Sequence, residues 1–289
     1  MEKTQRGQKV FLTVLVIYLL CYAFRLFEYF ILRTDQTWVG EAIVHKLIGI
    51  VILFVAAKLL QFTVEEIGFS KQNSLRNLLK GLAFGIGVFI IAYAVEVLIA
   101  VSQGRFDSLQ IYVSAYAIDE NVGHQTEALF FVICIVGNIV NVVMEEGLFR
   151  GLFAKILEKK YSFVVSALIA SVLFGFWHVI GPVRNCYDGT SSMEGMIANV
   201  IMLLVTSALV GFKFAMLTEM TGNHYMAMGD HFVNNTIVNL LHVVSDTGAD
   251  EMMVVRVSIA QSVSCILVLI RYIQLCRKRR QKVSNYSVL

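Results

Sequence analysis

The sequence has a single proline and few charged residues. Of its 289 residues, 16% are Asp, Glu, Lys or Arg and 57% are hydrophobic, and the mean hydropathy is +0.70. This balance lies outside the range of ordinary soluble domains and excludes that class. It indicates a polytopic membrane protein.

Closely spaced cysteines are also missing. The five cysteines are scattered along the chain, at Cys21, Cys134, Cys186, Cys265 and Cys276. Their spacing excludes a zinc knuckle and a disulfide framework, so we interpret them as packing residues. Because the sequence has no internal repeat, low-complexity tract or long linker either, we expect one membrane domain over residues 1–289.

Long apolar runs dominate the sequence. A helix needs at least about 18 mainly apolar residues to cross roughly 30 Å of hydrocarbon. Eight segments reach this length: Val10–Leu32, Ile43–Phe62, Gly81–Val101, Ala128–Ile156, Phe163–Ile180, Met196–Leu217, Tyr225–Val244 and Met252–Leu275. We therefore predict an all-α fold, a polytopic membrane helix bundle of about eight transmembrane helices. The first run is too long for the apolar region of a signal peptide, so we expect it to be the first span.

Small residues within the third apolar run are predicted to pack against a neighbouring helix. They are Gly81, Gly85 and Gly87. Because a glycine has no side chain, two helix backbones can approach each other closely at such positions. We therefore interpret these glycines as packing residues and assign them no chemical role.

Basic residues gather in alternate connections between these segments. They occupy the N-terminus, the second and fourth connections and the RKRRQK tail, with Lys3, Arg6, Lys9, Lys71, Arg76, Lys80, Lys155, Lys159 and Lys160 before the tail. The opposite loops collect acidic residues, among them Asp107, Asp246, Asp250 and Glu251. By the positive-inside rule, both termini are predicted to be cytoplasmic.

This topology accounts for the basic residues, so the net charge of +3 does not indicate nucleic acid as a partner. We expect the lipid bilayer as the surrounding partner, and the tail can meet anionic headgroups. Residues 63–80 mix charged and apolar side chains and are predicted to lie in the cytoplasmic interface. The sequence leaves the oligomeric state open.

Ionisable residues within the apolar segments are candidate functional residues, because a charge in the bilayer is costly. Most of them lie close to the end of a segment, where the side chain can reach the interface. This interpretation covers Arg25, Glu28, Lys46, Lys58 and Arg271, while Glu96 is expected to pair locally and His242 to lie near an exit.

The stretch NVVMEEGLFRGLF is different, because Glu145 and Glu146 are adjacent within an apolar helix. Arg150 follows Glu146 at i+4, so these two side chains can pair on one face. The pair explains one glutamate and leaves Glu145 available.

Two later segments carry polar residues at the same spacing. Phe174 precedes His178 by four residues, and His231 precedes Asn235 by four, so each pair shares a helical face. Taken singly, the two histidines are interpreted as core residues whose hydrogen bonds are satisfied. Asn235 is interpreted as a residue that forms an interhelical hydrogen bond. When positions are counted from the cytoplasmic end of each helix, His178 lies nearer the outer end of its helix than the other polar residues do. A tilted fifth helix or a wrong segment boundary would reconcile their depths.

Together the three stretches form a set in chain order. EEGLFR fits EExxxR, FGFWH fits FxxxH and HFVNN fits HxxxN. In these motifs the chain resembles the CPBP intramembrane proteases, a family that includes type II CAAX prenyl endopeptidases and bacteriocin-processing or immunity (Abi) proteins. The resemblance covers residues 127–244, which we expect to form the catalytic core, and EEIGFS before the third helix is similar to a weaker family feature.

The resemblance implies catalytic roles for four residues. Glu145 would be the base that activates water, His178 would help to hold that water, and His231 and Asn235 would donate to the oxyanion. Glu146 and Arg150 would be the supporting ion pair. No cofactor is favoured, because Asn235 is a poor zinc ligand, but zinc on Glu145, His178 and His231 stays an alternative.

The function predicted on this basis is an intramembrane endopeptidase, CAAX-protease-like, that hydrolyses a peptide bond with a glutamate-activated water. Its substrate would be a membrane-associated or lipidated peptide or a small membrane protein. The alternative is a non-hydrolytic bacteriocin-immunity or partner-binding membrane protein. A proton-coupled transporter is disfavoured, because inverted repeats and proline-broken helix pairs are missing. The expected location is a bacterial cell membrane.

Overall fold

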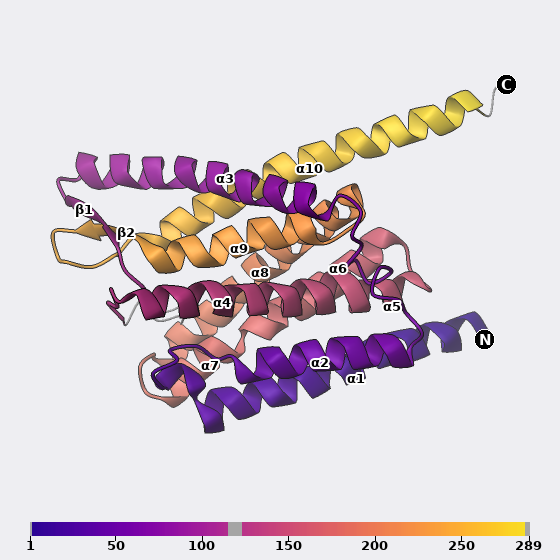
Figure 1. The fold of residues 1–289 in the computed structure, drawn as a ribbon, viewed down its shortest axis with the longest axis horizontal. Helices are drawn as coiled ribbons and strands as arrows, with labels where there is room; N and C mark the ends of the chain where they lie inside the picture. Colours follow the sequence, from indigo (N-terminus) through magenta and orange to yellow (C-terminus); the bar gives the residue numbers. More distant parts are fainter. Residues whose placement is uncertain (1, 115–122, 287–289) are drawn as a thin grey trace.

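The computed structural model describes residues 2–114 and 123–286, which are almost entirely helical. The long helices run roughly parallel or antiparallel to one another in a single bundle (Figure 1). They are α1 (Glu2–Phe27), α2 (Val44–Leu59), α3 (Ser74–Ser102), α4 (Ala128–Glu145), α6 (Phe163–His178), α8 (Met193–Thr221), α9 (Tyr225–Leu240) and α10 (Met253–Tyr286). The remaining elements are short: η1 (Glu28–Leu32), η2 (Thr34–Gln36), β1 (Phe106–Ile111), η3 (Glu146–Phe153), α5 (Ala154–Glu158), α7 (Ile180–Tyr187) and β2 (Leu241–Ser245).

Within the described residues, six helical segments are long and apolar enough to cross a membrane. They are Lys9–Gln36, Ser74–Ser102, Ala128–Glu158, Phe163–Tyr187, Met193–Thr221 and Met253–Arg279. Each of the eight predicted apolar segments contains a helix, but α2 and α9 have only 16 residues each. The chain is therefore a polytopic helical membrane protein with six candidate spans.

Two predicted boundaries were wrong. The segment expected to end at Ile180 continues through α7, so the candidate span runs to Tyr187. The segment expected to reach Val244 leaves the helix at Leu240, and the chain continues as β2. That strand pairs with β1 in an antiparallel sheet, with Gln110 opposite His242, which ties the end of α9 to the segment after α3.

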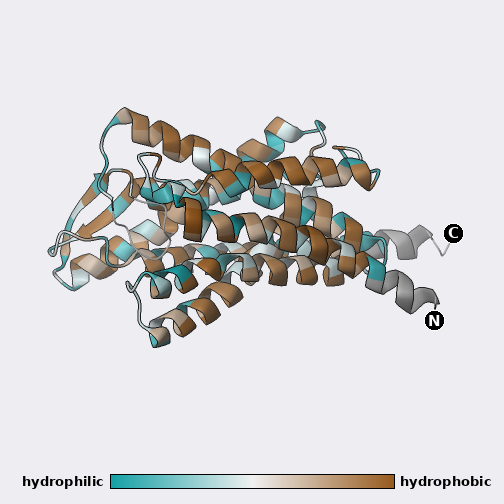
Figure 2. Ribbon diagram, turned by 90° about the horizontal axis from the view of Figure 1, so that it is seen from below, coloured by the Kyte–Doolittle hydropathy of each residue, from teal (hydrophilic) through white to brown (hydrophobic). Residues whose placement is uncertain are grey.

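Hydrophobic residues line the helices along most of their length, and hydrophilic residues are frequent in the connections (Figure 2). Many large apolar side chains on the helices are exposed, with Leu98 at 69% and Leu209 at 62% as examples. Exposed apolar surface on this scale is unfavourable in water and suits contact with lipid. It supports the assignment to the membrane.

Three packed cores hold the bundle together. The largest surrounds Trp177 and Phe149 and joins α1, α2, η3 and α6. A second joins α3, α9 and β2 around Phe89 and Val233, and a third joins α8, α9 and α10 around Phe214. The polar residues described below lie among these cores.

Glycines bring α3 and α9 close together. A Cβ at Gly81 would lie 2.2 Å from the Met226 carbonyl oxygen, and one at Gly229 would lie 2.6 Å from that of Leu78. Neither position can therefore carry a side chain without moving the backbone. Gly87 has open space instead, so the packing role predicted for it along with Gly81 was wrong.

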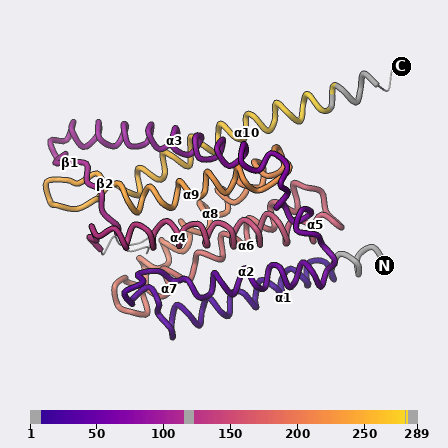
Figure 3. Tube along the Cα trace, in the orientation of Figure 1, coloured from indigo at the N-terminus to yellow at the C-terminus, as the bar shows by residue number. Residues whose placement is uncertain are grey.

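Both ends of the described chain lie at the same end of the bundle (Figure 3). The connections after α2 and α8 lie there as well, whereas β1, β2 and α7 lie at the opposite end. Successive long helices therefore alternate in direction along the whole chain.

Candidate active site

The EExxxR motif lies at a change of helical geometry. Glu145 is the last residue of α4, and the eight residues of η3 continue from Glu146 in π-helical form, all of them buried. A π turn carries more residues than an α turn and is rare outside functional sites. The segment 63–80 contributes to its surroundings, because a Cβ at Gly151 would lie 2.5 Å from the Ile67 carbonyl oxygen. The weaker EEIGFS feature thus packs directly on the motif helix.

Glu145 is 2% exposed and receives neutral hydrogen-bond donors. Asn141 Nδ2 donates to Oε2 at 3.2 Å, and Trp177 Nε1 donates to Oε1 at 3.0 Å. The Arg25 guanidinium lies 4.0 Å from Oε1. These contacts fix the carboxylate without engaging it in a close ion pair.

Glu146 has the opposite environment, since charged or chargeable groups contact both oxygens. Arg150 Nε lies 3.4 Å from Oε2, and His231 Nδ1 lies 2.9 Å from Oε1. Arg150 also donates from Nε to the Gly211 carbonyl at 3.3 Å, and its guanidinium stacks 4.0 Å above the Phe174 ring. Its two terminal nitrogens have no hydrogen-bond partner among the described residues.

His231 links the two glutamates. While Nδ1 contacts Glu146, Nε2 lies 3.5 Å from Glu145 Oε2. The imidazole stacks on Phe214 at 4.7 Å between ring centroids and is 4% exposed. The HxxxN motif on α9 is thereby joined to the EExxxR motif, although 85 residues separate His231 from Glu146.

His178 lies at the end of α6, one residue after Trp177. Its Nδ1 bonds the Phe174 carbonyl at 2.8 Å. A carbonyl can only accept, so Nδ1 carries the proton and Nε2 of the neutral ring keeps a lone pair. His178 lies within electrostatic range of Glu145. Because the candidate span continues through α7 to Tyr187, His178 lies within that span and not at its outer end, which agrees with a wrong segment boundary as the reason for the discrepancy in depth noted from the sequence.

The predicted residues are brought together to different degrees. Glu145, Glu146, Arg150 and His231 contact one another directly. Asn235 follows His231 by one turn on the same helix, and its Oδ1 accepts a hydrogen bond from Asn234 Nδ2 at 3.0 Å. Its Nδ2 has no acceptor among the described residues.

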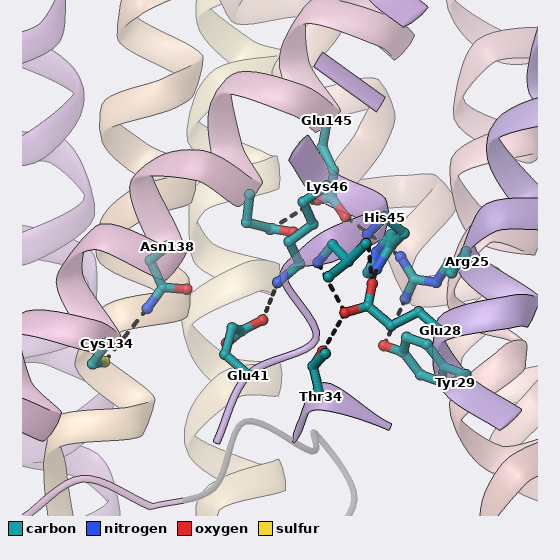
Figure 4. Close-up of polar contacts among 12 residues, drawn as sticks. Arg25, Glu28, Tyr29, Thr34, Glu41, His45, Lys46, Cys134, Asn138 and Glu145 are labelled. Atoms are coloured by element: carbon teal, nitrogen blue, oxygen red, sulfur yellow. Dashed lines mark hydrogen bonds and ion pairs between the residues drawn. The ribbon is translucent and has the colours of Figure 1, made fainter. Parts of the chain in front are cut away.

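Several polar residues near Glu145 were misinterpreted from the sequence. Arg25, Glu28 and Lys46 do not reach the interface, because they are 6%, 0% and 9% exposed. Glu28 binds His45, and Lys46 binds Glu41. Figure 4 shows Arg25, His45 and Lys46 gathered next to Glu145. Their only sequence signal was charge inside an apolar run, and their partners lie on other helices or in the loop before α2, which the sequence does not place beside them.

A second missed pair lies between α8 and α9. Lys213 Nζ lies 2.8 Å from Asp230 Oδ2, and both side chains are buried. Lys213 stands well inside an apolar run, and Asp230 directly precedes His231. An ionisable residue in that position is a functional candidate by default, so a signal for Lys213 was present.

A metal does not fit the residues as they are arranged. Zinc requires several ligands converging on one point at about 2.0–2.3 Å. Among the described residues, no group of three or more His, Cys, Asp or Glu side chains forms such an arrangement. Glu145, His178 and His231 each have one nitrogen or oxygen bound to a separate partner, and His231 Nε2 and Glu145 Oε2 face each other directly at 3.5 Å.

A cavity of about 160 Å³ is lined in part by Arg150. Its lining includes Glu219 and His224 but none of Glu145, His178 or His231. The His224 ring is buried, and this burial lowers its pKa to about 4. The imidazole bonds the Ile67 carbonyl and fixes the loop between α2 and α3. We therefore assign this cavity no part in substrate binding.

Residues 127–237 match the family described as Type II CAAX prenyl endopeptidase Rce1-like. The chain is also similar to a Bacillus subtilis (strain 168) protein named "Putative membrane peptidase YdiL". The two are 27% identical over 217 residues, which is 73% of this chain and 76% of the relative. Both findings agree with the resemblance drawn from the three motifs.

Proposed function

We propose that this chain, whose residues 127–237 match the Rce1-like type II CAAX prenyl endopeptidase family, hydrolyses a peptide bond within the membrane. Glu145 would take a proton from the attacking water, and His178 would hold that water through Nε2. His231, with both ring nitrogens protonated so that Nε2 can donate while Nδ1 donates to Glu146, and Asn235 would donate hydrogen bonds to the oxyanion that develops on the scissile carbonyl.

The difference between the two adjacent glutamates carries this proposal. Glu146 is engaged by Arg150 through one oxygen and by His231 Nδ1 through the other. Glu145 has neutral donors from Asn141 and Trp177, while the nearest charged groups stay at 3.5 Å and 4.0 Å. A carboxylate that is oriented but not neutralised can accept a proton from water. Glu146 in turn orients the imidazole of His231.

We also propose that α2 and α9 cross the membrane, giving eight spans with both termini in the cytoplasm. Sixteen helical residues reach only about 24 Å, and the flanking residues would complete the crossing. The alternating helix directions support this topology, because the basic N-terminus, loops and tail all gather at one end of the bundle (Figure 3). The related Bacillus subtilis protein favours a bacterial cell membrane.

The substrate class follows from the position of the site. A peptide that reaches Glu145 from the bilayer or its surface must itself be held at the membrane, so we propose a lipidated or membrane-associated peptide or a small membrane protein. The name of the matched family supports a prenylated CAAX peptide as the first probe.

The test uses purified protein in liposomes and a prenylated CAAX peptide that fluoresces when it is cut. Glu145→Gln should lower kcat by about 1,000-fold, since the amide cannot act as a base. Glu145→Asp should also fail, because the shorter side chain retracts the base from the near-attack position. Unchanged melting temperatures would separate lost chemistry from lost folding.

Other outcomes of the same assay identify the competing functions. Inhibition by o-phenanthroline, with one zinc per chain that disappears in His178→Ala and His231→Ala, would replace the glutamate mechanism by a metal-dependent one. Biological activity that persists unchanged in Glu145→Gln would instead support a non-hydrolytic immunity or partner-binding protein.

A further inference from the structure

A chain of buried and half-buried polar side chains connects three helices and ends at Asn235. Lys213 Nζ on α8 donates to Gln261 Oε1 on α10 at 3.0 Å. Gln261 Nε2 donates to Asn234 Oδ1 on α9 at 2.5 Å, and Asn234 Nδ2 donates to Asn235 Oδ1 at 3.0 Å. We call Lys213, Gln261, Asn234 and Asn235 the amide relay.

The lysine determines the direction of every bond in the amide relay. An ammonium group donates and cannot accept, so Gln261 must present its oxygen to Lys213 and its nitrogen to Asn234. Asn234 must then accept through Oδ1 and donate through Nδ2. Asn235 consequently accepts through Oδ1, and its own Nδ2 is left as a free donor at the end of the relay.

The lysine has a buried acidic partner. Lys213 is 0% exposed and Asp230 is 3% exposed, and they pair at 2.8 Å. Lys213 Nζ also donates to Ser264 Oγ at 3.2 Å and lies 4.5 Å from the centroid of the Phe214 ring. Phe214 in turn stacks on His231. Lys213 is therefore connected to both proposed oxyanion donors, to His231 through Phe214 and to Asn235 through the amide relay.

We propose that the amide relay is a positioning device that orients Asn235 so that Nδ2, and not Oδ1, faces the scissile carbonyl. The inference rests on the proposed function. An asparagine side chain can rotate by 180° with little change in shape, and the reversed amide would direct a lone pair at the developing oxyanion. The fixed polarity from Lys213 prevents this reversal, and the cation strengthens the successive donors by polarising them.

Gln261→Glu tests the relay with almost no change in volume. A carboxylate at this position still accepts from Lys213 but cannot donate to Asn234 Oδ1. The Asn234 side-chain amide should rotate by 180° so that Nδ2 donates to the introduced carboxylate. Asn235 should then donate from Nδ2 to Asn234 Oδ1, so that its Nδ2 is no longer free. Gln261→Leu is the matched variant, because it interrupts the relay without reversing it.

The measurement is kcat and KM for the fluorogenic prenylated peptide in liposomes, together with the melting temperature of each variant. Loss of one oxyanion donor costs about 100-fold in kcat, so Asn235→Ala sets the expected floor. Gln261→Glu should lower kcat at least about ten-fold toward that floor with KM unchanged, and Gln261→Leu should lower it less.

A double variant separates positioning from structure. In the Asn235→Ala background, Gln261→Glu should have no further effect on kcat, because the amide that it misorients is already gone. If Asn235→Ala lowers kcat but Gln261→Glu leaves it unchanged, the positioning role of the amide relay is wrong, while the proposed function is unaffected. Equal losses from Gln261→Glu with and without Asn235 would also overturn it, by indicating a structural role. A wild type that does not cut the peptide would overturn the proposed function and this inference together.

Discussion

Two buried charged clusters in this protein look alike in composition and differ in how completely they are satisfied. One surrounds Glu145, Glu146 and Arg150. The other joins Glu96 of α3, Asp250 of the loop before α10 and Arg256 of α10, beside His242 of β2, and we call it the Arg256 cluster. In the Arg256 cluster the guanidinium makes four hydrogen bonds to two carboxylates, at 2.6–3.3 Å. Within the described part of the chain, Arg150 makes one hydrogen bond, to a carbonyl.

The difference indicates what each cluster does. In the Arg256 cluster the guanidinium pairs with both carboxylates, and Asp250 also binds His242 Nδ1 at 3.1 Å. Of the guanidinium nitrogens only Nε lacks a hydrogen-bond partner among the described residues, so little capacity remains for a substrate. Around Glu145, donors and acceptors are held in place with capacity left over among the residues that the structure describes. The terminal nitrogens of Arg150 and the Nδ2 of Asn235 illustrate this. Burial of charge alone therefore does not distinguish the candidate site, whereas incomplete pairing together with the three motifs does.

The largest effect on stability is expected at Arg256. Arg256→Met leaves Glu96 and Asp250 buried without their cation, and breaking a buried pair in this way costs about 3–5 kcal/mol. The yield of folded protein and the melting temperature should fall sharply, while the turnover of the protein that does fold stays normal. Arg279→Met is the matched control, since its pair with Glu219 is exposed and its loss should have little effect.

Arg150→Ala is expected to have a smaller effect on stability and a larger one on activity. It strips one carboxylate, Glu146, of a contact at 3.4 Å, so the loss of stability should be about 3 kcal/mol or less. Adding Glu146→Gln should restore the yield, because the unpaired charge is removed, while turnover stays low because His231 has lost its anionic partner. Normal yield and cleavage in Arg150→Ala alone would show that the pair is unimportant.

The smallest effect concerns pH. Burial raises the pKa of Asp250, but its hydrogen bonds to His242 and Arg256 outweigh this, and the net pKa lies below the ordinary value of 3.8. A carboxyl with a depressed folded pKa contributes stability above its unfolded pKa and loses it as the pH falls through the folded pKa. The melting temperatures of wild type and Asp250→Asn should thus converge below about pH 4. A constant difference across that range would contradict the assignment.

The sequence predicted the helical membrane fold and the residues of the motif set, because both depend on local patterns. Apolar runs predict helices, and i, i+4 spacing placed Glu146 beside Arg150. The π-helical form of η3 and the continuation of the span from α6 into α7 were not predictable in this way. They depend on packing against segments distant in the chain, such as Ile67 against Gly151.

Partners of the remaining charges were not predictable for the same reason. Glu96 was expected to pair locally but pairs with Arg256, 160 residues away. Arg25 was expected at the interface but lies over the Trp177 ring at 4.5 Å. In a bilayer, charge near the end of an apolar run is compatible with either a reach to the interface or a buried partner. Only the arrangement of the helices decides between them.

The central claim is that Glu145 acts as a base while the Arg256 cluster only supports the fold. The most direct test compares peptide termini in membranes of cells that produce equal amounts of wild type, Glu145→Gln or Glu96→Gln. The account predicts that a defined set of new termini present with wild type disappears with Glu145→Gln and persists with Glu96→Gln. The same termini in all three membranes would contradict it.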